Sequence, residues 1–154
     1  MYHLAGEYEC KIDAKGRVKL PAGLLKQLGA LSLSFTINRG FENHLMMYQE
    51  QVWTKKTNEI DQLLNIYLEE DRKVLRYFYR GATKVDADGS GRILIPKNLI
   101  DYAGLEKQIV LSAYQNQIEI WAKNRYEEMI AEEPENFSAI AQKAFSKGVN
   151  KNND

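Results

Sequence analysis

The 154-residue chain carries 21 basic and 21 acidic side chains, so its formal net charge is zero. This balance argues against nucleic-acid binding through overall charge, because most nucleic-acid-binding domains are basic. Any DNA affinity must therefore come from a local cationic patch, or from several weak patches gathered by oligomerisation.

The cellular compartment can be predicted from three absences in the sequence. The single cysteine, Cys10, excludes an intramolecular disulfide and fits a reducing compartment. No apolar run approaches the roughly 20 residues of a membrane span. The first residues lack the apolar core of a secretory signal. We expect a cytoplasmic protein without a membrane partner.

One unit occurs twice in the chain, 75 residues apart. Residues 6–30 align without a gap on residues 81–105, and seven of the 25 positions are identical. The identical pairs are Gly6/Gly81, Asp13/Asp88, Gly16/Gly91, Arg17/Arg92, Pro21/Pro96, Leu24/Leu99 and Gly29/Gly104. The similarity continues from residues 45–53 to residues 118–126 at an offset of 73. Such a repeat indicates one supersecondary unit used twice.

The first copy predicts the element order ββαββ. Alternating apolar and charged residues predict strands at 8–12 and 17–20, joined by a turn over 13–16. Pro21 fits the first turn of a short helix, and Gly29 suits its C-terminal end. Two further strands are expected at about residues 33–37 and 44–48.

The second copy repeats this order. Strands are expected at 83–87, 92–95, 108–112 and 117–121, with a turn at 88–91 and a helix from Pro96 to Gly104. Strands this short bury little surface alone, so we expect the two half-barrels to interlock into one small β-barrel of the α+β class.

The remaining segments are predicted to be helical. Apolar residues at helical spacing predict one long amphipathic helix over 54–80. Further helices are expected at 123–132 and 137–145, separated by Pro134, before a disordered tail. The predicted organisation is copy 1 at 5–52, a connecting helix at 53–80, copy 2 at 81–124, C-terminal helices at 125–147 and the tail at 148–154.

The motif D-x-x-G-R-x-x-x-P occurs in both copies and gives the strongest indication of function. Val18 and Leu20 are expected to point into the core, so Arg17 and Lys19 point outward. Residues 11–19 carry four cations, Lys11, Lys15, Arg17 and Lys19, against Asp13 alone, a net of +3. A guanidinium at a turn suits bidentate contact with phosphate or guanine, and the lysines attract phosphates.

An alternative is that Arg17 and Arg92 only bond to Asp13 and Asp88 and lock the turns. The two roles are compatible, because the aspartate can hold the turn while the arginine reaches outward. Gly16 and Gly91 would permit the positive φ that the turns need.

The second copy is less basic than the first. Residues 86–94 carry Arg92 against Asp86 and Asp88, a net of −1, and Leu94 replaces the lysine found at position 19. We therefore expect the first copy to dominate phosphate contact, with Arg92 as the main contributor from the second.

The paired motifs resemble those of the MraZ family of bacterial regulators, which are built from two tandem AbrB-like half-barrels. The resemblance lies in the segments GEYECKIDAKGRVKLPAGL, VDADGSGRILIPKNL and IEIWAKNRY and covers roughly residues 4–131. It implies a homo-oligomeric ring that binds short direct repeats upstream of the division and cell-wall gene cluster. It also implies that Arg17 and Arg92 face double-stranded DNA in the nucleoid, with Lys15 and Lys19 carried over only as their neighbours.

Other functions are less well supported by the sequence. AbrB-like half-barrels also occur in antitoxins, and residues 123–145 could hold a partner protein, so a protein-interaction module is the alternative. Asp86, Asp88 and Ser90 imitate a calcium loop, but Lys97 stands where the bidentate Glu belongs. Neither histidine sits in a zinc motif, and no nucleophile, base and orienter converge. We expect no metal, cofactor, small-molecule substrate or enzymatic activity.

Overall fold

The computed structural model describes residues 3–29, 33–132 and 136–152, and the chain divides into two compact units, Met1–Lys123 and Asn124–Asp154. The strands are β1 (Gly6–Lys11), β2 (Arg17–Lys19), β3 (Ser34–Arg39), β4 (Leu45–Gln49), β5 (Thr83–Asp86), β6 (Arg92–Leu94), β7 (Gln108–Tyr114) and β8 (Gln117–Ala122). The helices are α1 (Ala22–Leu28), α2 (Glu50–Leu63), α3 (Glu69–Tyr79), α4 (Lys97–Ala103), α5 (Lys123–Ala131) and α6 (Phe137–Asn152). The predicted α+β class and the ββαββ order of both copies are confirmed.

The two copies share their sheets rather than folding separately. The larger sheet has six strands in the order β1-β7-β8-β4-β3-β5, and the smaller consists of β2 and β6. All pairings are antiparallel. Exchanging each strand for its counterpart in the other copy gives the same six-strand order in reverse, so a pseudo-twofold relation connects the repeats. Interlocking of the two copies is what the short strands require.

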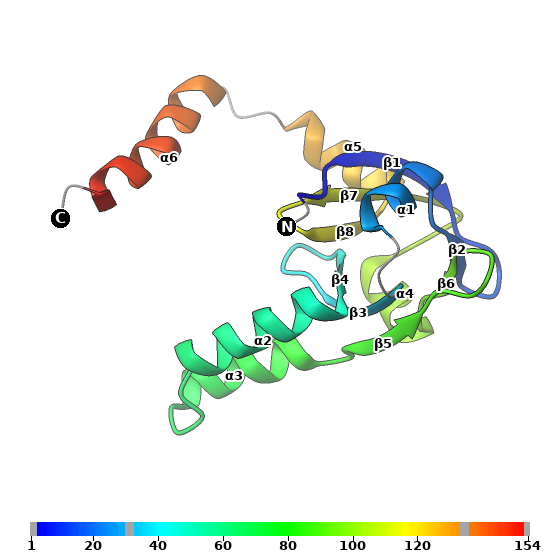
Figure 1. The fold of residues 1–154 in the computed structure, drawn as a ribbon, viewed down its shortest axis with the longest axis horizontal. Coiled ribbons are helices and arrows are strands. Elements are labelled where there is room, and N and C mark those ends of the chain that lie inside the picture. Colours follow the sequence, from blue (N-terminus) through cyan, green and yellow to red (C-terminus); the bar gives the residue numbers. More distant parts are fainter. Residues whose placement is uncertain (1–2, 30–32, 133–135, 153–154) are drawn as a thin grey trace. The chain divides into compact units, whose positions relative to one another are not determined.

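Strand β1 has a different partner from the one that the sequence suggested. The sequence suggests β2, across the turn, but β1 pairs over its whole length with β7 of the second copy, from Gly6↔Ala113 to Lys11↔Gln108. Next to its end, an isolated bridge joins Ile12 to Val18 of β2. The turn at 13–16 therefore carries the chain from one sheet to the other (Figure 1).

The core is filled by equivalent residues of the two copies. Val18, Leu20 and Leu24 are at most 1% exposed, and their counterparts Ile93, Ile95 and Leu99 are at most 2% exposed. Phe35, Ile37, Leu45, Met47, Ile109, Leu111 and Ile120 complete it from the larger sheet. The expected inward positions of β2 and β6 are confirmed.

Each short helix begins one residue later than the prolines suggested. Pro21 and Pro96 have extended backbone (ψ 144° and 145°) and occupy the N-cap positions of α1 and α4. The carbonyl of Pro21 accepts the amide of Leu25 at 2.9 Å, and that of Pro96 accepts the amide of Ile100 at 3.0 Å. Gly29 and Gly104 end the two helices, as predicted.

The segment between the copies is a helical hairpin, so the prediction of one long helix was wrong. Helix α2 ends at Leu63 and α3 starts at Glu69. The side chain of Asn65 accepts the amide of Tyr67 at 2.9 Å, and Asp71 accepts the amide of Asn65 at 2.8 Å. These polar side chains satisfy backbone groups that a continuous helix would pair internally, which stabilises the turn.

The base of the hairpin is anchored to the body by aromatic packing. Trp53 on α2 stacks on Phe78 of α3 with 5.5 Å between ring centroids, and it also contacts Tyr48 of β4. The two helices extend from the strands in Figure 1. Phe78 is the only buried residue of α3, and α2 has none, so most of the hairpin lies outside the core.

The second unit contains α5 and α6. Helix α6 continues to Asn152, seven residues past the expected end at Phe145, so residues 148–152 are helical rather than a disordered tail. Residues 153 and 154 lie outside the described part of the chain. Among the described residues, no helix is long and apolar enough to cross a bilayer.

The buried side of β6 offers a test of the interlocked fold. Ile93 is fully buried, and truncation of such a side chain costs about 2–5 kcal/mol. Ile93→Ala should therefore lower the urea midpoint strongly. The matched control is Leu94→Ala at the next position, where the side chain is 55% exposed and the expected change is within about 0.5 kcal/mol. Equal losses in the two variants would contradict the register of β6.

Candidate nucleic-acid interface

The first D-x-x-G-R turn is held by the carboxylate of Asp13. One oxygen accepts the amides of Lys15 at 2.9 Å and Arg17 at 2.8 Å, and the other accepts Nε of Arg17 at 2.8 Å. The amide of Gly16 donates to the carbonyl of Asp13 at 3.0 Å. Asp13 therefore fixes both the turn and the arginine that follows it.

The second turn repeats this geometry. The carboxylate of Asp88 accepts the amides of Ser90 and Arg92, both at 2.9 Å, and Nε of Arg92 at 3.1 Å. The amide of Gly91 donates to the carbonyl of Asp88 at 2.9 Å. Two separate sequence segments thus build the same hydrogen-bonded turn.

Glycine at the fourth turn position is required by conformation and by space. Gly16 has φ +87° and Gly91 has φ +78°. A Cβ on Gly16 would lie 2.9 Å from the carbonyl oxygen of Ile95, a backbone atom that cannot move aside cheaply. Ile95, which directly follows β6, lies this close to Gly16 because it donates its amide to the carbonyl of Gly16 at 2.8 Å.

Both turn aspartates are more acidic than free aspartate. The amide of Arg17 is the main cause that lowers the pKa of Asp13, and the amide of Arg92 does the same for the pKa of Asp88. The arginine guanidinium and a second amide add to this lowering, and desolvation opposes it in each turn. Both carboxylates therefore stay ionised at neutral pH and keep their arginines oriented.

The arginines do more than lock the turns. Each ion pair engages Nε only, and the side chains of Arg17 and Arg92 remain 39% and 40% exposed. Within the described part of the chain, no partner is recorded for the terminal amino groups of either arginine. The two roles weighed from the sequence thus occur together, because the aspartate holds Nε while the outer edge of the guanidinium stays available.

Pairing of β2 with β6 brings the two motifs together on one ribbon. The register sets Arg17 opposite Leu94, Val18 opposite Ile93, and Lys19 opposite Arg92. Val18 and Ile93 are buried. The outward face of the β2–β6 ribbon is therefore formed by the other four residues, Arg17, Leu94, Lys19 and Arg92. Directly opposite side chains lie about 5 Å apart at Cβ and diagonal ones about 7–8 Å. The arginines of the two copies are therefore diagonal neighbours.

The ribbon contains a like-charged pair that sequence reasoning could not find. Lys19 and Arg92 are directly opposite, an arrangement that destabilises an antiparallel pair. Arg92 is partly compensated by Asp88, whereas Lys19 is exposed and has no recorded partner in the described residues. An anionic ligand bound between Lys19 and Arg92 would relieve this repulsion and stabilise the strand pair. Only the pairing between copies, which no local pattern encodes, would have revealed it.

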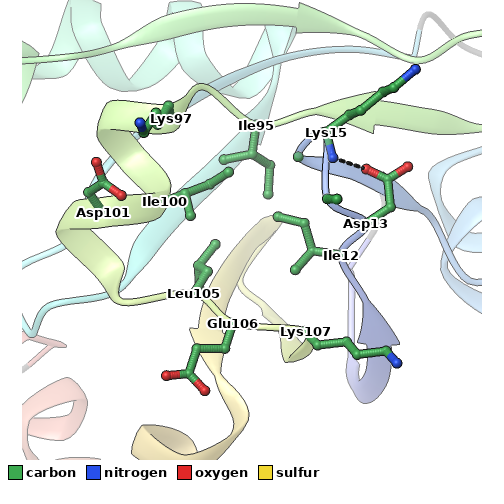
Figure 2. Close-up of a pocket in the computed structure, with 12 residues that line it drawn as sticks. Ile12, Asp13, Lys15, Ile95, Lys97, Ile100, Asp101, Leu105, Glu106 and Lys107 are labelled. Atoms are coloured by element: carbon green, nitrogen blue, oxygen red, sulfur yellow. Dashed lines mark hydrogen bonds between the residues drawn. The ribbon is translucent and has the colours of Figure 1, made fainter.

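The other predicted cations lie in different places. Lys15 is exposed at the tip of the first turn, and its side chain extends away from the Asp13 carboxylate (Figure 2). Lys11 is on β1, outside the ribbon, and shares its strand face with Glu7 and Glu9. The expected pairing of β1 with β2 was wrong, because β1 pairs with β7, and the role of Lys11 in DNA binding stays a prediction.

A cavity of about 680 Å³ lies beside the first turn (Figure 2). Its apolar lining is formed by Ile12, Ile95, Ile100 and Leu105. Its charged lining is balanced, with Lys15, Lys97 and Lys107 against Asp13, Asp101 and Glu106. The cavity therefore lacks the excess of cations that distinguishes the outward face of the ribbon.

The residues that the sequence analysis did not assign to a functional site are buried or bonded within the fold. Burial raises the pKa of the Cys10 thiol to about 11, so it stays protonated at neutral pH. His44 is buried just before β4, stacked on Trp121 at 4.4 Å, with Nε2 3.3 Å from Glu119. Asp86 accepts a hydrogen bond from Ser34. Among the described residues, no group of three or more metal-ligating side chains converges.

Comparison with known proteins places the chain in a family. The family model described as "MraZ protein, putative antitoxin-like" matches residues 3–76 and 78–148, one match for each copy. The chain belongs to the MraZ family. The MraZ match covers both D-x-x-G-R turns and most of the hairpin, so the resemblance inferred from the paired motifs is confirmed.

Several MraZ relatives match along nearly the whole chain. A protein of Christiangramia forsetii is 39% identical over 147 residues, which covers 94% of each chain. One of Cytophaga hutchinsonii is 35% identical over 144 residues, covering 93% of this chain and 95% of the relative. One of Moorella thermoacetica is 36% identical over 138 residues, covering 90% and 94%. All three are named Transcriptional regulator MraZ.

The MraZ family consists of non-enzymatic transcriptional regulators, so the expectation of a regulator rather than an enzyme is confirmed. Among solved structures, the solution structure of PHS018 from Pyrococcus horikoshii matches with a TM-score of 0.34 and 18% identity, covering 78% of this chain and 89% of that one. No conclusion rests on so distant a likeness.

The lowered aspartate pKa values predict how stability depends on pH. A carboxylate whose folded pKa lies below its unfolded value contributes stability that is complete above about pH 5 and is lost as the pH falls through the folded pKa. The wild type should therefore lose thermal stability as the pH drops below the ordinary value of 3.8. Asp13→Asn combined with Asp88→Asn should show a flatter decline.

The measurement is the melting temperature between pH 3 and pH 7. Glu7→Gln with Glu9→Gln, two exposed carboxylates on β1, provides the control. If the aspartate variant kept the full acid dependence of the wild type, the turns would not be the groups that titrate.

Proposed function

We propose that the chain regulates transcription by inserting the β2–β6 ribbon into the major groove of promoter DNA. The observation that supports this most strongly is the like-charged pair Lys19 and Arg92, directly opposite one another and diagonal to Arg17, of which only Arg92 has a carboxylate partner among the described residues. The major groove admits a two-stranded β-ribbon, and arginine donates two hydrogen bonds to the O6 and N7 atoms of guanine. Arg17 and Arg92 would read bases, while Lys15 and Lys19 would bind phosphates.

The electrostatics of the ribbon support DNA as the ligand of an otherwise neutral protein. The segment 13–19 contributes +2 and the segment 88–94 contributes zero, which gives +2 for the paired turns and their ribbon strands. The carboxylates of Asp13 and Asp88 bond to groups within their own turns and to Nε of the arginines, which leaves the outer guanidinium edges for a ligand. One such patch binds DNA weakly, and several patches held on one assembly gain affinity through effective concentration.

We further propose the finer features that the family resemblance implies. The ribbons of a homo-oligomeric ring would bind short direct repeats in the promoter of the division and cell-wall gene cluster, which places the protein on the nucleoid. The larger sheet and the β2–β6 ribbon would close one small barrel, since β1 and β5 at the two sheet edges each contact a ribbon strand.

Substitution of both arginines tests the DNA interface. Two bidentate contacts are together worth about 2–6 kcal/mol, so Arg17→Ala with Arg92→Ala should weaken binding to DNA from upstream of its own gene by about 30-fold or more. Lys19→Ala should lower affinity for all sequences and reduce the salt slope by about one. The measurement is a gel shift across a salt series, with scrambled DNA for comparison.

The matched control is Lys55→Ala, an exposed cation on α2 away from the ribbon, which should keep wild-type affinity. Circular dichroism should show that the arginine variant remains folded. Unchanged specific affinity in the double variant would refute the interface. Steep salt dependence without any sequence preference in the wild type would leave only non-specific binding.

The hairpin supplies a surface that fits self-assembly with a second copy. Its tip exposes four large apolar side chains, Leu63 at 79%, Ile66 at 61%, Tyr67 at 84% and Leu68 at 54%, and Val74 in the middle of α3 is 49% exposed. Exposed apolar residues gathered this closely mark an interaction site more often than isolated ones do. A second copy is the occupant that a neutral DNA-binding chain needs in order to multiply its ribbons.

Oligomer mass tests this surface. Leu63→Ser with Tyr67→Ser should shift the assembly to smaller species in sedimentation velocity, because it removes apolar area from the contact. Phe41→Ser, which changes a side chain that is 76% exposed but lies before β4, should leave the mass unchanged. An assembly of unaltered mass in the hairpin variant would exclude the tip from the subunit contact.

A protein-interaction module is the second candidate, and α6 is the observation that favours it. Helix α6 exposes Phe137 at 68%, Ile140 at 53% and Phe145 at 81%. The family description also includes the word antitoxin. A pull-down that retains one stoichiometric protein partner and no DNA would favour this function over the first.

A further inference from the structure

One apolar side chain stands among the cations of the ribbon. Leu94 is 55% exposed and occupies the position that Lys19 holds in the first copy. Its neighbours Ile93 and Ile95 are buried, 0% and 2% exposed, so the strand alternation turns Leu94 outward. Single exposed leucines are ordinary on protein surfaces. What distinguishes this one is its place, directly opposite Arg17 on a face that otherwise carries only cations.

The side chain of Leu94 also has a neighbour in the first turn. Its Cδ1 atom lies 3.7 Å from the point where a Cβ on Gly16 would stand, so the side chain lies beside the first turn. A leucine packed against a hydrogen-bonded turn loses little further freedom when a ligand covers it, which favours binding.

The chemistry of DNA limits what such a residue can recognise. Leucine cannot bond a phosphate or the polar edge of a base. The major groove offers one apolar group on its base edges, the C5 methyl of thymine. A ribbon that places Arg17 at a guanine places Leu94 about 5 Å away at Cβ, which is close enough to reach the same base step or the adjacent one.

We propose that Leu94 is a specificity-determining residue that reads the methyl group of a thymine beside the base contacted by Arg17. The inference rests on the proposed function, since it assumes that the ribbon enters the major groove. It adds a recognised chemical group that the arginines cannot supply.

The same residue gives the ribbon a direction. Arg17 and Arg92 are related by the pseudo-twofold axis, and by themselves they would read a site and its inverse equally. Lys19 at one end and Leu94 at the other break that symmetry. A ribbon with one cationic end and one apolar end distinguishes the two orientations of its site.

Deoxyuridine tests this directly, because it differs from thymidine only by the methyl group. Each thymine of the bound promoter DNA is replaced singly by deoxyuridine, and affinity of the full chain is measured by fluorescence anisotropy. For the wild type, at least one replacement should lower affinity about three- to fivefold, the effect of one buried methyl group. Leu94→Ala should bind the unmodified DNA more weakly by a similar factor and be indifferent to that replacement.

Two further variants complete the test. Leu94→Lys restores the residue of the first copy, so it should also ignore the replacement and should raise the salt slope by about one. Phe41→Ala removes an exposed apolar side chain away from the ribbon and should keep the full sensitivity of the wild type. All variants should keep the oligomer mass of the wild type.

The outcomes separate this inference from the proposed function. Specific binding that depends on the arginines, with no sensitive thymine or with sensitivity that persists in Leu94→Ala, would overturn the role of Leu94 alone. A change of oligomer mass in Leu94→Ala would assign the residue to a subunit contact and overturn it as well. Absence of specific DNA binding by the wild type would overturn both proposals together.

Discussion

The pairing of β2 with β6 is the constraint on which the rest of the structure depends. The two strands belong to different copies and have three residues each, too few to be stable alone. They are fixed by the fully buried pair Val18 and Ile93, and by reciprocal hydrogen bonds from Leu20 to the carbonyl of Gly91 at 2.9 Å and from Ile95 to the carbonyl of Gly16 at 2.8 Å. Each copy therefore completes the other, and neither turn can be positioned without its counterpart.

Pairing of β2 with β6 gathers a few charges from separate segments into one ordered cationic face. The neutral chain has no overall attraction for DNA. Pairing of the copies sets Arg17, Lys19 and Arg92 on one face, over a buried floor that cannot rearrange easily. The aspartates hold Nε of each arginine and leave its outer edge available, so the guanidiniums are oriented before any ligand arrives. Preorganisation of this kind reduces the entropy lost on binding.

The sequence predicted what local patterns encode and failed where tertiary pairing decides. The repeat, the turns at Asp13 and Asp88, and the inward positions of Val18 and Ile93 follow from residue spacing, and the structure contains them. The break at Asn65 was missed because its apolar neighbours keep helical periodicity, while the turn depends on hydrogen bonds to polar side chains. The partner of β1 was missed because β1 pairs with a strand about 100 residues later.

Amide hydrogen exchange of the full chain, with and without promoter DNA, tests the central claim most directly. Exchange reports protection along the backbone without altering any side chain. We predict that DNA protects residues 13–19 and 88–94 together, because both segments belong to one ribbon. Protection of only one segment, or protection confined to the hairpin or α6 while both turns exchange as in the free protein, would contradict it.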